Sequence, residues 1–229
     1  MNNWRHKTVA VVGCGGLGVP AAWTLAHAGV QRLRLIDADN VDLTNLHRQV
    51  LFSEADCGEA KTARLAAALH KRFEGLHVTC VDQRLTPANA DGLLADCDVA
   101  VEGSDDAVAK FAVNDWASKR GRGRSAVIAA AIGRRGQWMV VRPDGACYRC
   151  LFEAPPPAEM LATCAIAGVL GPVVGAVGAL AARSLIQTLD GHPDPAASAL
   201  VRWLPGMIRR TPVQRAPDCP CAQMGMEET

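Results

Sequence analysis

Glycines and an acid at fixed spacing are the residues of this chain that most directly suggest chemistry. Gly13, Gly15 and Gly18 form a G-x-G-x-x-G motif, and Gly16 is an additional glycine within it. In such a motif the first glycine allows a tight turn, the second lets the backbone approach a phosphate, and the third lets a helix pack on a strand. Asp37 follows at about the 20-residue spacing at which an acid binds ribose hydroxyls. These residues predict a nucleotide site, for either a redox dinucleotide or ATP.

The elements around the motif are those of a strand–helix–strand unit. An apolar, β-branched run at Val9–Val12 precedes the glycines, and an alanine-rich helical pattern at Leu17–Ala28 follows them. A second apolar run, Leu33–Ile36, ends at the acid. The free N–H groups at the start of the helix would face an anion. A glycine-rich turn alone also occurs where chains simply pack tightly, but the full set favours nucleotide binding.

Cysteines form the second group of residues with chemical potential. The chain holds nine, of which Cys147 and Cys150 form a C-x-x-C pair and Cys219 and Cys221 a C-x-C pair. Four thiolates in two close pairs suit tetrahedral zinc. The alternative is a set of free thiols on a loose tail, and the tight C-x-C spacing leaves that alternative open.

The remaining cysteines divide into two kinds. We expect Cys14, Cys57, Cys80 and Cys97 to be small buried or half-buried residues. Cys164 differs, because it follows a proline-rich loop and precedes a glycine-rich helix. A position near a helix N-terminus lowers the pKa of a thiol and favours the thiolate.

Composition narrows the class of protein. The 229 residues suit one domain, and a net charge of +1 argues against a large nucleic-acid-binding surface. The basic run at Lys119–Arg124 is best explained as a solvated turn. An odd number of cysteines and no signal peptide favour a reducing cytoplasm, with the cysteines used for metal or chemistry.

Strands alternate with helices over the first 130 or so residues, which predicts a parallel sheet with ligands at the carboxyl ends of its strands. The further strands expected there are His77–Val81, Val99–Glu102 and Ala126–Ala130, and the further helices are Ala60–Phe73, Pro87–Leu94 and Ala107–Lys119.

The pattern changes after Gly133. Gln137–Arg142 is expected to be a strand, Glu153–Glu159 an irregular loop, and Ala199–Leu204 with Met207–Val213 an antiparallel pair. The tail that follows, Asp218–Thr229, is expected to fray at its end. Ala165–Ala182 is uncharged and long enough to raise the possibility of a membrane span, but Pro172 and its glycines favour a tightly packed core or interface helix. The fold class expected is α/β: a Rossmann-like, mostly parallel sheet with helices on both faces, a C-terminal antiparallel extension and a zinc knuckle.

Further motifs follow the glycine turn in a specific order. They are D-x-D-x-V-x-x-x-N-L-x-R-Q over residues 37–49, Gly58–Lys61, Gly103–Asp106, Cys147–Cys150, Thr163–Cys164 and Gly168–Gly175. This ordered set covers nearly the whole chain and resembles the adenylating enzymes of the HesA/MoeB/ThiF family, bacterial relatives of the ubiquitin-activating enzymes. Molybdopterin-synthase and thiazole-biosynthesis adenylyltransferases are the closest in character.

The resemblance implies a reaction. ATP and Mg²⁺ would adenylate the C-terminal glycine of a small β-grasp sulfur-carrier protein ending in Gly-Gly, with pyrophosphate leaving, as the step before thiocarboxylate formation. A separate protein would donate the sulfur. Residues 1–229 would form one adenylation domain and work as a homodimer. Residues 1–133 would bind the nucleotide, and residues 134–229 would bind the carrier and hold a four-cysteine zinc site.

The resemblance also implies roles for single residues. Arg48, Lys61, Asp105 and Cys164 would be catalytic, with Arg48 reaching across the dimer, Asp105 holding Mg²⁺ and Cys164 transferring sulfur. The residues that would bind the nucleotide are Gly13, Gly15, Gly16, Gly18, Asp37, Asp39, Asn45, Arg48, Gln49, Lys61, Asp105 and Asp106. The zinc ligands would be Cys147, Cys150, Cys219 and Cys221. As alternatives, Arg48 or Lys61 could be surface ion-pair partners, and Asp105 could be a helix N-cap.

Three positions depart from the family pattern. Arg5 is the only candidate for the arginine that relatives supply from an N-terminal arm, Asp106 replaces an asparagine, and the second cysteine pair is C-x-C. Two alternative functions therefore stay open. Adenylation could lead to a thioester for conjugation of a ubiquitin-like protein or to peptide modification, or the chain could be a nucleotide-binding scaffold without turnover. Only the glycine turn supports an NAD-dependent dehydrogenase.

Overall fold

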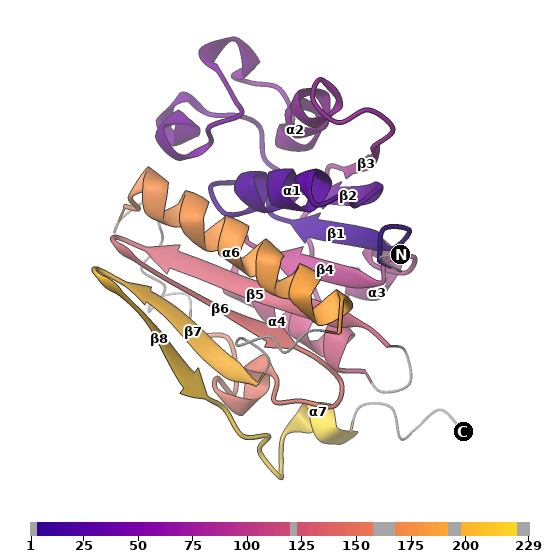
Figure 1. The fold of residues 1–229 in the computed structure, drawn as a ribbon, viewed down its shortest axis with the longest axis vertical. Helices are drawn as coiled ribbons and strands as arrows, with labels where there is room; N and C mark the ends of the chain where they lie inside the picture. Colours follow the sequence, from indigo (N-terminus) through magenta and orange to yellow (C-terminus); the bar gives the residue numbers. More distant parts are fainter. Residues whose placement is uncertain (1–3, 120–122, 158–167, 192–197, 224–229) are drawn as a thin grey trace.

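One twisted sheet of eight strands runs through the computed structural model, with helices on both faces (Figure 1). The structure describes residues 4–119, 123–157, 168–191 and 198–223. The strands are β1 (Thr8–Val12), β2 (Arg32–Ile36), β3 (His77–Val81), β4 (Val99–Glu102), β5 (Ser125–Ile132), β6 (Arg135–Val141), β7 (Ala199–Leu204) and β8 (Met207–Pro212).

The strand order is β3-β2-β1-β4-β5-β6-β7-β8. The first five strands of this order pair in parallel, and the pairs from β5 to β8 are antiparallel. The Rossmann-like sheet and the antiparallel C-terminal extension predicted from the sequence are therefore confirmed. The core strands were readable as continuous apolar runs, because a strand with helices on both faces of its sheet is buried on both sides.

The helices and 3₁₀ segments are α1 (Gly18–His27), α2 (Lys61–His70), α3 (Ala90–Leu93), α4 (Ala107–Ser118), α6 (Gly171–Leu189), α7 (Pro220–Gln223), η1 (Leu43–Arg48), η2 (Glu54–Asp56) and η3 (Tyr148–Cys150). Side chains of α1, α2 and α6 share one core with Val9 and Val11 of β1. Those of α3 and α4 share another with Ala10 and Val12. The two faces of β1 thus belong to two different layers, as Figure 1 shows with α6 and α1 in front of the sheet and α4 behind it.

The helix α6 decides the question of a membrane span. By length and composition it could cross a membrane. It instead packs along α1, and a Cβ on Gly178 would overlap the carbonyl oxygen of Leu17. Trp138 donates its indole N–H to Ser184 of the helix at 3.1 Å. The glycines therefore allow close backbone approach, and α6 is a core helix, as expected.

Several local expectations were wrong. Cys57 and Cys80 are exposed, whereas Cys14 and Cys97 are buried as predicted. The reason is position: Cys57 follows η2 on a surface loop, and Cys80 lies on β3, the edge strand of the sheet. Within the tail, Pro220–Gln223 form α7, where Cys221 is fully buried, and the end of the tail that was expected to fray (224–229) lies outside the described residues. Residues 153–157 are irregular as predicted, while 158 and 159 lie outside the described residues.

Candidate functional site

A cleft of about 760 Å³ opens at the carboxyl ends of β1, β2 and β4. The chain leaves β1 toward α1 on one face and leaves β4 toward α4 on the other, so the two connections diverge above neighbouring strands. Ligands of open α/β sheets bind at such a divergence. The residues predicted to bind a nucleotide that line this cleft are Gly13, Gly15, Gly16, Asp37, Asp39, Asn45, Arg48, Gln49, Lys61, Asp105 and Asp106.

The glycine turn forms the floor of the cleft, and at two of its glycines the packed backbone leaves no room for a side chain. Gly13 has a φ of +85°, and a Cβ there would lie 2.6 Å from the backbone nitrogen of Ser104. A Cβ on Gly18 would overlap the carbonyl oxygen of Gly13. The first and third glycines of the motif are therefore required by packing. Gly15 has space around it and borders the cleft, as a phosphate-facing glycine requires.

Asp37 lies beside this turn at the end of β2. Its carboxylate accepts hydrogen bonds from the N–H of Cys14 at 2.6 Å and from the N–H of Asp39 at 2.8 Å. Burial raises the pKa of the Asp37 carboxyl above its usual range, against the opposing effects of the Asp39 N–H and the Lys61 ammonium. Each carboxylate oxygen keeps a lone pair, so the group can accept hydrogen bonds from ribose hydroxyls.

Basic side chains gather on one wall of the cleft. Lys61, the first residue of α2, is 7% exposed at its side chain and forms an ion pair with Asp39 at 2.8 Å. Arg48, at the end of η1, donates to the side-chain oxygen of Asn45. Gln49 is 2% exposed, and its side-chain oxygen has no hydrogen-bond partner within the described residues. A buried amide oxygen without a donor at the wall of a cleft is an acceptor that a ligand can satisfy.

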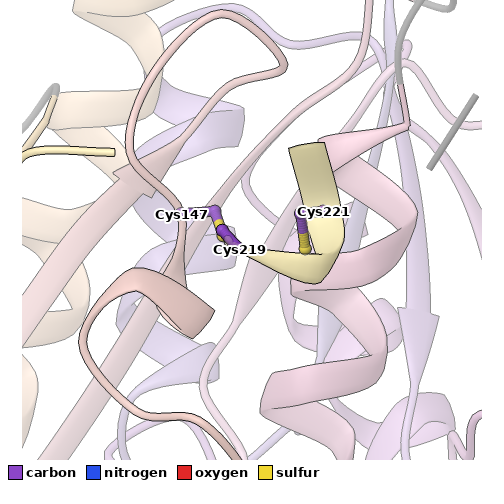
Figure 2. Close-up of side chains that lie close together, drawn as sticks. All are labelled: Cys147, Cys219 and Cys221. Carbon is purple, nitrogen blue, oxygen red and sulfur yellow. The ribbon is translucent and has the colours of Figure 1, made fainter. Parts of the chain in front are cut away.

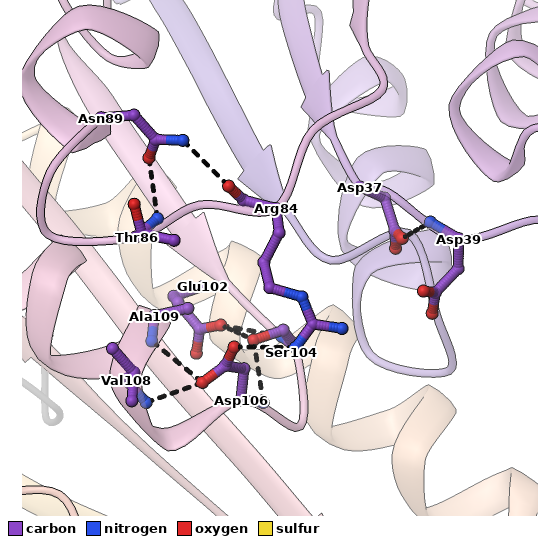
Figure 3. A network of polar contacts seen from close by, with 10 residues as sticks. All are labelled: Asp37, Asp39, Arg84, Thr86, Asn89, Glu102, Ser104, Asp106, Val108 and Ala109. Carbon is purple, nitrogen blue, oxygen red and sulfur yellow. Dashed lines mark hydrogen bonds and ion pairs between the residues drawn. The ribbon is translucent and has the colours of Figure 1, made fainter.

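Asp105 and Asp106 are adjacent but have different surroundings, of which Figure 3 shows those of Asp106. Asp106 is the N-cap of α4 and accepts from the N–H of Val108 at 2.8 Å, and it also faces Arg84 at 3.3 Å. Asp105 is exposed to the cleft and makes no hydrogen bond or ion pair within the part of the chain that the structure describes. The N-cap alternative considered for Asp105 is wrong, because Asp106 fills that position. Asp105 keeps a free carboxylate.

Sequence reasoning missed four residues at this end of the sheet: Arg84, Glu102, Ser104 and Lys110. Arg84 borders the cleft from the loop after β3, and its guanidinium compensates the charge of Asp106. Glu102 and Lys110 form a buried ion pair at 2.5 Å. The position of Arg84 and Glu102 at or after strand ends was a usable signal, whereas the pairing of Lys110 with Glu102 depends on how α4 folds back on β4.

The cysteine cluster lies on the α4 side of the sheet (Figure 2). The sulfur atoms of Cys147, Cys219 and Cys221 lie within 4.8 Å of one another, and all three residues are buried. The Cys147 sulfur is 3.4 Å from that of Cys219 and 3.8 Å from that of Cys150. Tetrahedral zinc with Zn–S bonds of about 2.3 Å separates its sulfur ligands by about 3.8 Å. The cluster can therefore hold a metal ion, and soft thiolates favour zinc.

Neighbouring groups orient the cluster. Asn114 of α4 is fully buried, accepts the N–H of Tyr148 at 2.7 Å and donates to the Cys221 sulfur at 3.4 Å. The N–H of Ala216 donates to the Cys150 sulfur at 3.4 Å. Burial raises the pKa of the Cys219 thiol to about 11, so a nearby cation would strongly favour its thiolate. These contacts hold the segment from Ala216 to Cys221 against α4 and η3.

Comparison with known proteins settles the family. The model of the ThiF family matches residues 1–221. The chain belongs to the ThiF family. It is 41% identical over 216 residues to the "Adenylyltransferase and sulfurtransferase MOCS3" of Sus scrofa, an alignment that covers 93% of this chain and 47% of the pig protein. The chain thus spans about half the length of the curated relatives that head the comparison.

A bacterial relative is matched over most of its length. The "Sulfur carrier protein adenylyltransferase" of Thermus thermophilus is 37% identical over 228 residues, which is 94% of this chain and 82% of that protein. Among solved structures, E. coli MccB with ATP superposes with a TM-score of 0.81 at 24% identity, over 96% of this chain and 68% of that one. The structural likeness supports the ThiF-family fold.

Three residues singled out in the sequence of this ThiF-family chain are not part of the described cleft. Gly18 is required by packing against Gly13 and does not line the cleft. Cys164 lies outside the described residues, so its role stays a prediction from the resemblance. Arg5 packs over Gly29, at the end of α1 that points away from the glycine turn. Its contribution to a neighbouring subunit's site likewise stays a prediction.

Proposed function

We propose that this chain is an ATP-dependent adenylyltransferase that acts on the C-terminal glycine of a small β-grasp sulfur-carrier protein. A carboxylate oxygen of the carrier attacks the α-phosphorus of ATP, the bond to the β-phosphate oxygen breaks, and pyrophosphate leaves. The product is an acyl-adenylate that a sulfur donor can convert to a thiocarboxylate. The convergence of Asp37, Lys61, Arg48 and the free Asp105 in one cleft carries the proposal, and the names of the curated relatives support it.

The reaction brings a carboxylate toward a polyphosphate, so positioning and charge neutralisation supply most of the catalysis. In our proposal Asp37 binds the ribose, and Gly15 and Gly16 face the phosphates. Arg48 and Lys61 neutralise the phosphate charge. Lys61 is held in place by Asp39, and Arg48 by Asn45, so both cations are oriented before the nucleotide binds.

Two metals complete the proposal. Asp105 fits Mg²⁺, because its carboxylate supplies hard oxygen ligands and has no partner among the described residues. Bound there, Mg²⁺ would offset phosphate charge. Cys147, Cys150, Cys219 and Cys221 would hold a structural zinc, which requires the reduced thiols that a cytoplasm maintains. The division into a nucleotide part (1–133) and a carrier-binding and zinc part (134–229), and assembly as a homodimer, belong to the same proposal.

Zinc can be tested separately from the reaction. Protein purified without chelator should contain about one equivalent of zinc per chain, and chelation should lower its melting temperature. A Cys219→Ser/Cys221→Ser variant should lose the metal, while Cys57→Ser, at an exposed free cysteine, should keep it. Substoichiometric metal in freshly prepared wild-type protein would count against the site.

The decisive test of the reaction is exchange of labelled pyrophosphate into ATP. It should depend on a β-grasp protein that ends in Gly-Gly, drawn first from any encoded beside this chain. The same carrier lacking its last glycine is the matched control and should support no exchange. If ATP binds but no such carrier supports exchange, the non-catalytic scaffold becomes the better explanation.

A further inference from the structure

A buried ion pair lies directly beneath the acidic turn of the cleft. Glu102 is 0% exposed and Lys110 is 6% exposed. The Lys110 ammonium donates to Glu102 Oε2 at 2.5 Å, to the Ser104 carbonyl at 2.7 Å and to the Ala129 carbonyl at 2.8 Å. All three of its protons therefore have acceptors, as a buried ammonium requires.

The second carboxylate oxygen of Glu102 holds the same residue of the turn, Ser104. Glu102 Oε1 accepts the N–H of Ser104 at 2.9 Å and also the Ser104 hydroxyl (Figure 3). The Ser104 backbone in turn abuts Gly13, where no Cβ would fit. The ion pair thus joins β4, β5 and the glycine turn at the point from which Asp105 extends into the cleft.

Charge pairing around the turn singles out one carboxylate. Lys110 pairs with Glu102. The charge of Asp106 is compensated by Arg84 and by the N–H groups at the start of α4. Asp105 is left as the carboxylate of the turn without a partner among the described residues. Burial raises the pKa of the Glu102 carboxyl, and the Lys110 ammonium opposes that shift.

We propose that Glu102 and Lys110 are positioning residues of the nucleotide site, which fix the Gly103–Asp106 turn so that the Asp105 carboxylate faces the cleft. A purely stabilising role explains the pair poorly, because apolar residues of similar volume are often as stable as a buried ion pair. Apolar residues cannot donate to the Ser104 and Ala129 carbonyls, so they would fill the space without holding the turn. The inference rests on the proposed adenylation for its kinetic test, but not for its structural one.

The informative variant is Glu102→Leu/Lys110→Met, which removes both charges and the acceptor of the Ser104 N–H. Lys110→Met alone leaves a buried carboxylate without its cation and is expected to destabilise the fold. Glu102→Asp/Lys110→Arg serves as the conservative rescue, since a shorter acid and a longer base span the same gap. Lys119→Met is the matched control, because it breaks an exposed ion pair with Asp91 at the far end of α4.

Two readouts separate positioning from folding. Amide hydrogen exchange should accelerate at Ser104 in the double variant and stay unchanged in β4 and in α4. The kcat of carrier-dependent pyrophosphate exchange should fall on the order of 10- to 100-fold, with affinity for adenosine and melting temperature retained. Glu102→Asp/Lys110→Arg should recover both, and Lys119→Met should match the wild type.

A double variant with wild-type kcat and wild-type protection at Ser104 would overturn the inference. So would a loss of kcat that comes with an equal loss of adenosine affinity and melting temperature, because that pattern indicates general unfolding. If the wild type itself shows no exchange, the proposed reaction fails. Hydrogen exchange at Ser104 then still tests whether the pair holds the turn.

Discussion

Two neighbouring aspartates allow a sharp test, because the structure gives them different partners. Asp106 caps α4 through the N–H groups of Val108 and Ala109 and faces Arg84. Replacing an N-cap by alanine costs about 1 kcal/mol, and an exposed ion pair adds less than about 1 kcal/mol. In a chain of 229 residues each kcal/mol lowers Tm by about 2–4 °C, so Asp106→Ala should lose about 2–8 °C.

Asp105→Ala should behave in the opposite way. Its carboxylate has no partner among the described residues, so Tm should stay unchanged. Adenylation should fall on the order of 10²-fold or more, as expected for loss of a charge-stabilising group. Asp106→Asn is the control, since asparagine also caps helices and should keep Tm.

Thermal melting and carrier-dependent pyrophosphate exchange measure the two effects on the same preparations. Equal loss of Tm in Asp105→Ala and Asp106→Ala would refute the assignment of the cap. Near wild-type exchange by Asp105→Ala would refute its role in the cleft.

Three further predictions concern the rest of the site. Arg48→Ala should lower exchange on the order of 10²-fold. If Arg48 acts across a dimer, mixing the Arg48→Ala and Asp105→Ala proteins should restore activity, because one site of each mixed dimer is then intact. No restoration would place Arg48 in its own subunit's site. Acidification should weaken adenosine binding at a pH above the usual aspartate range, because burial raises the pKa of Asp37 and the protonated acid loses its acceptors. The effect of this carboxyl on folding has the opposite sign: because its pKa is raised in the folded state, its protonation at low pH favours the fold. Weaker adenosine binding should therefore appear in calorimetry without a fall in Tm. Affinity that does not change with pH down to the usual aspartate range would contradict the prediction. Asn114→Ala should leave the Tyr148 N–H unpaired, which should lower the free energy of unfolding by about 1–3 kcal/mol and weaken zinc retention. Unchanged melting and metal content would argue against that contact.

The sequence predicted the parallel core well because its signals are local. Apolar runs such as Val9–Val12 and Val99–Glu102 are read from their continuous, β-branched-rich composition and their length, and both ends of the latter were predicted as observed. The glycine turn was readable for the same reason, since Gly13 needs a positive φ whatever surrounds it. Exposure was harder to predict, as Cys57 and Cys80 show, because it depends on which strand lies at the edge of the sheet.

The sequence did not predict which side chains pair with one another, because pairing depends on contacts between segments that fold back on each other. Asp105 and Asp106 are chemically equivalent in the sequence, and only the start of α4 decides which one caps the helix and which one stays free. The pairing of Glu102 with Lys110 and the contact of Asn114 with Cys221 likewise require the helix to lie on the sheet. The residue types and their order thus determined that the chain carries a nucleotide motif, acids, bases and paired cysteines. The tertiary structure decided which of these groups are already satisfied by the protein and which remain available to a ligand.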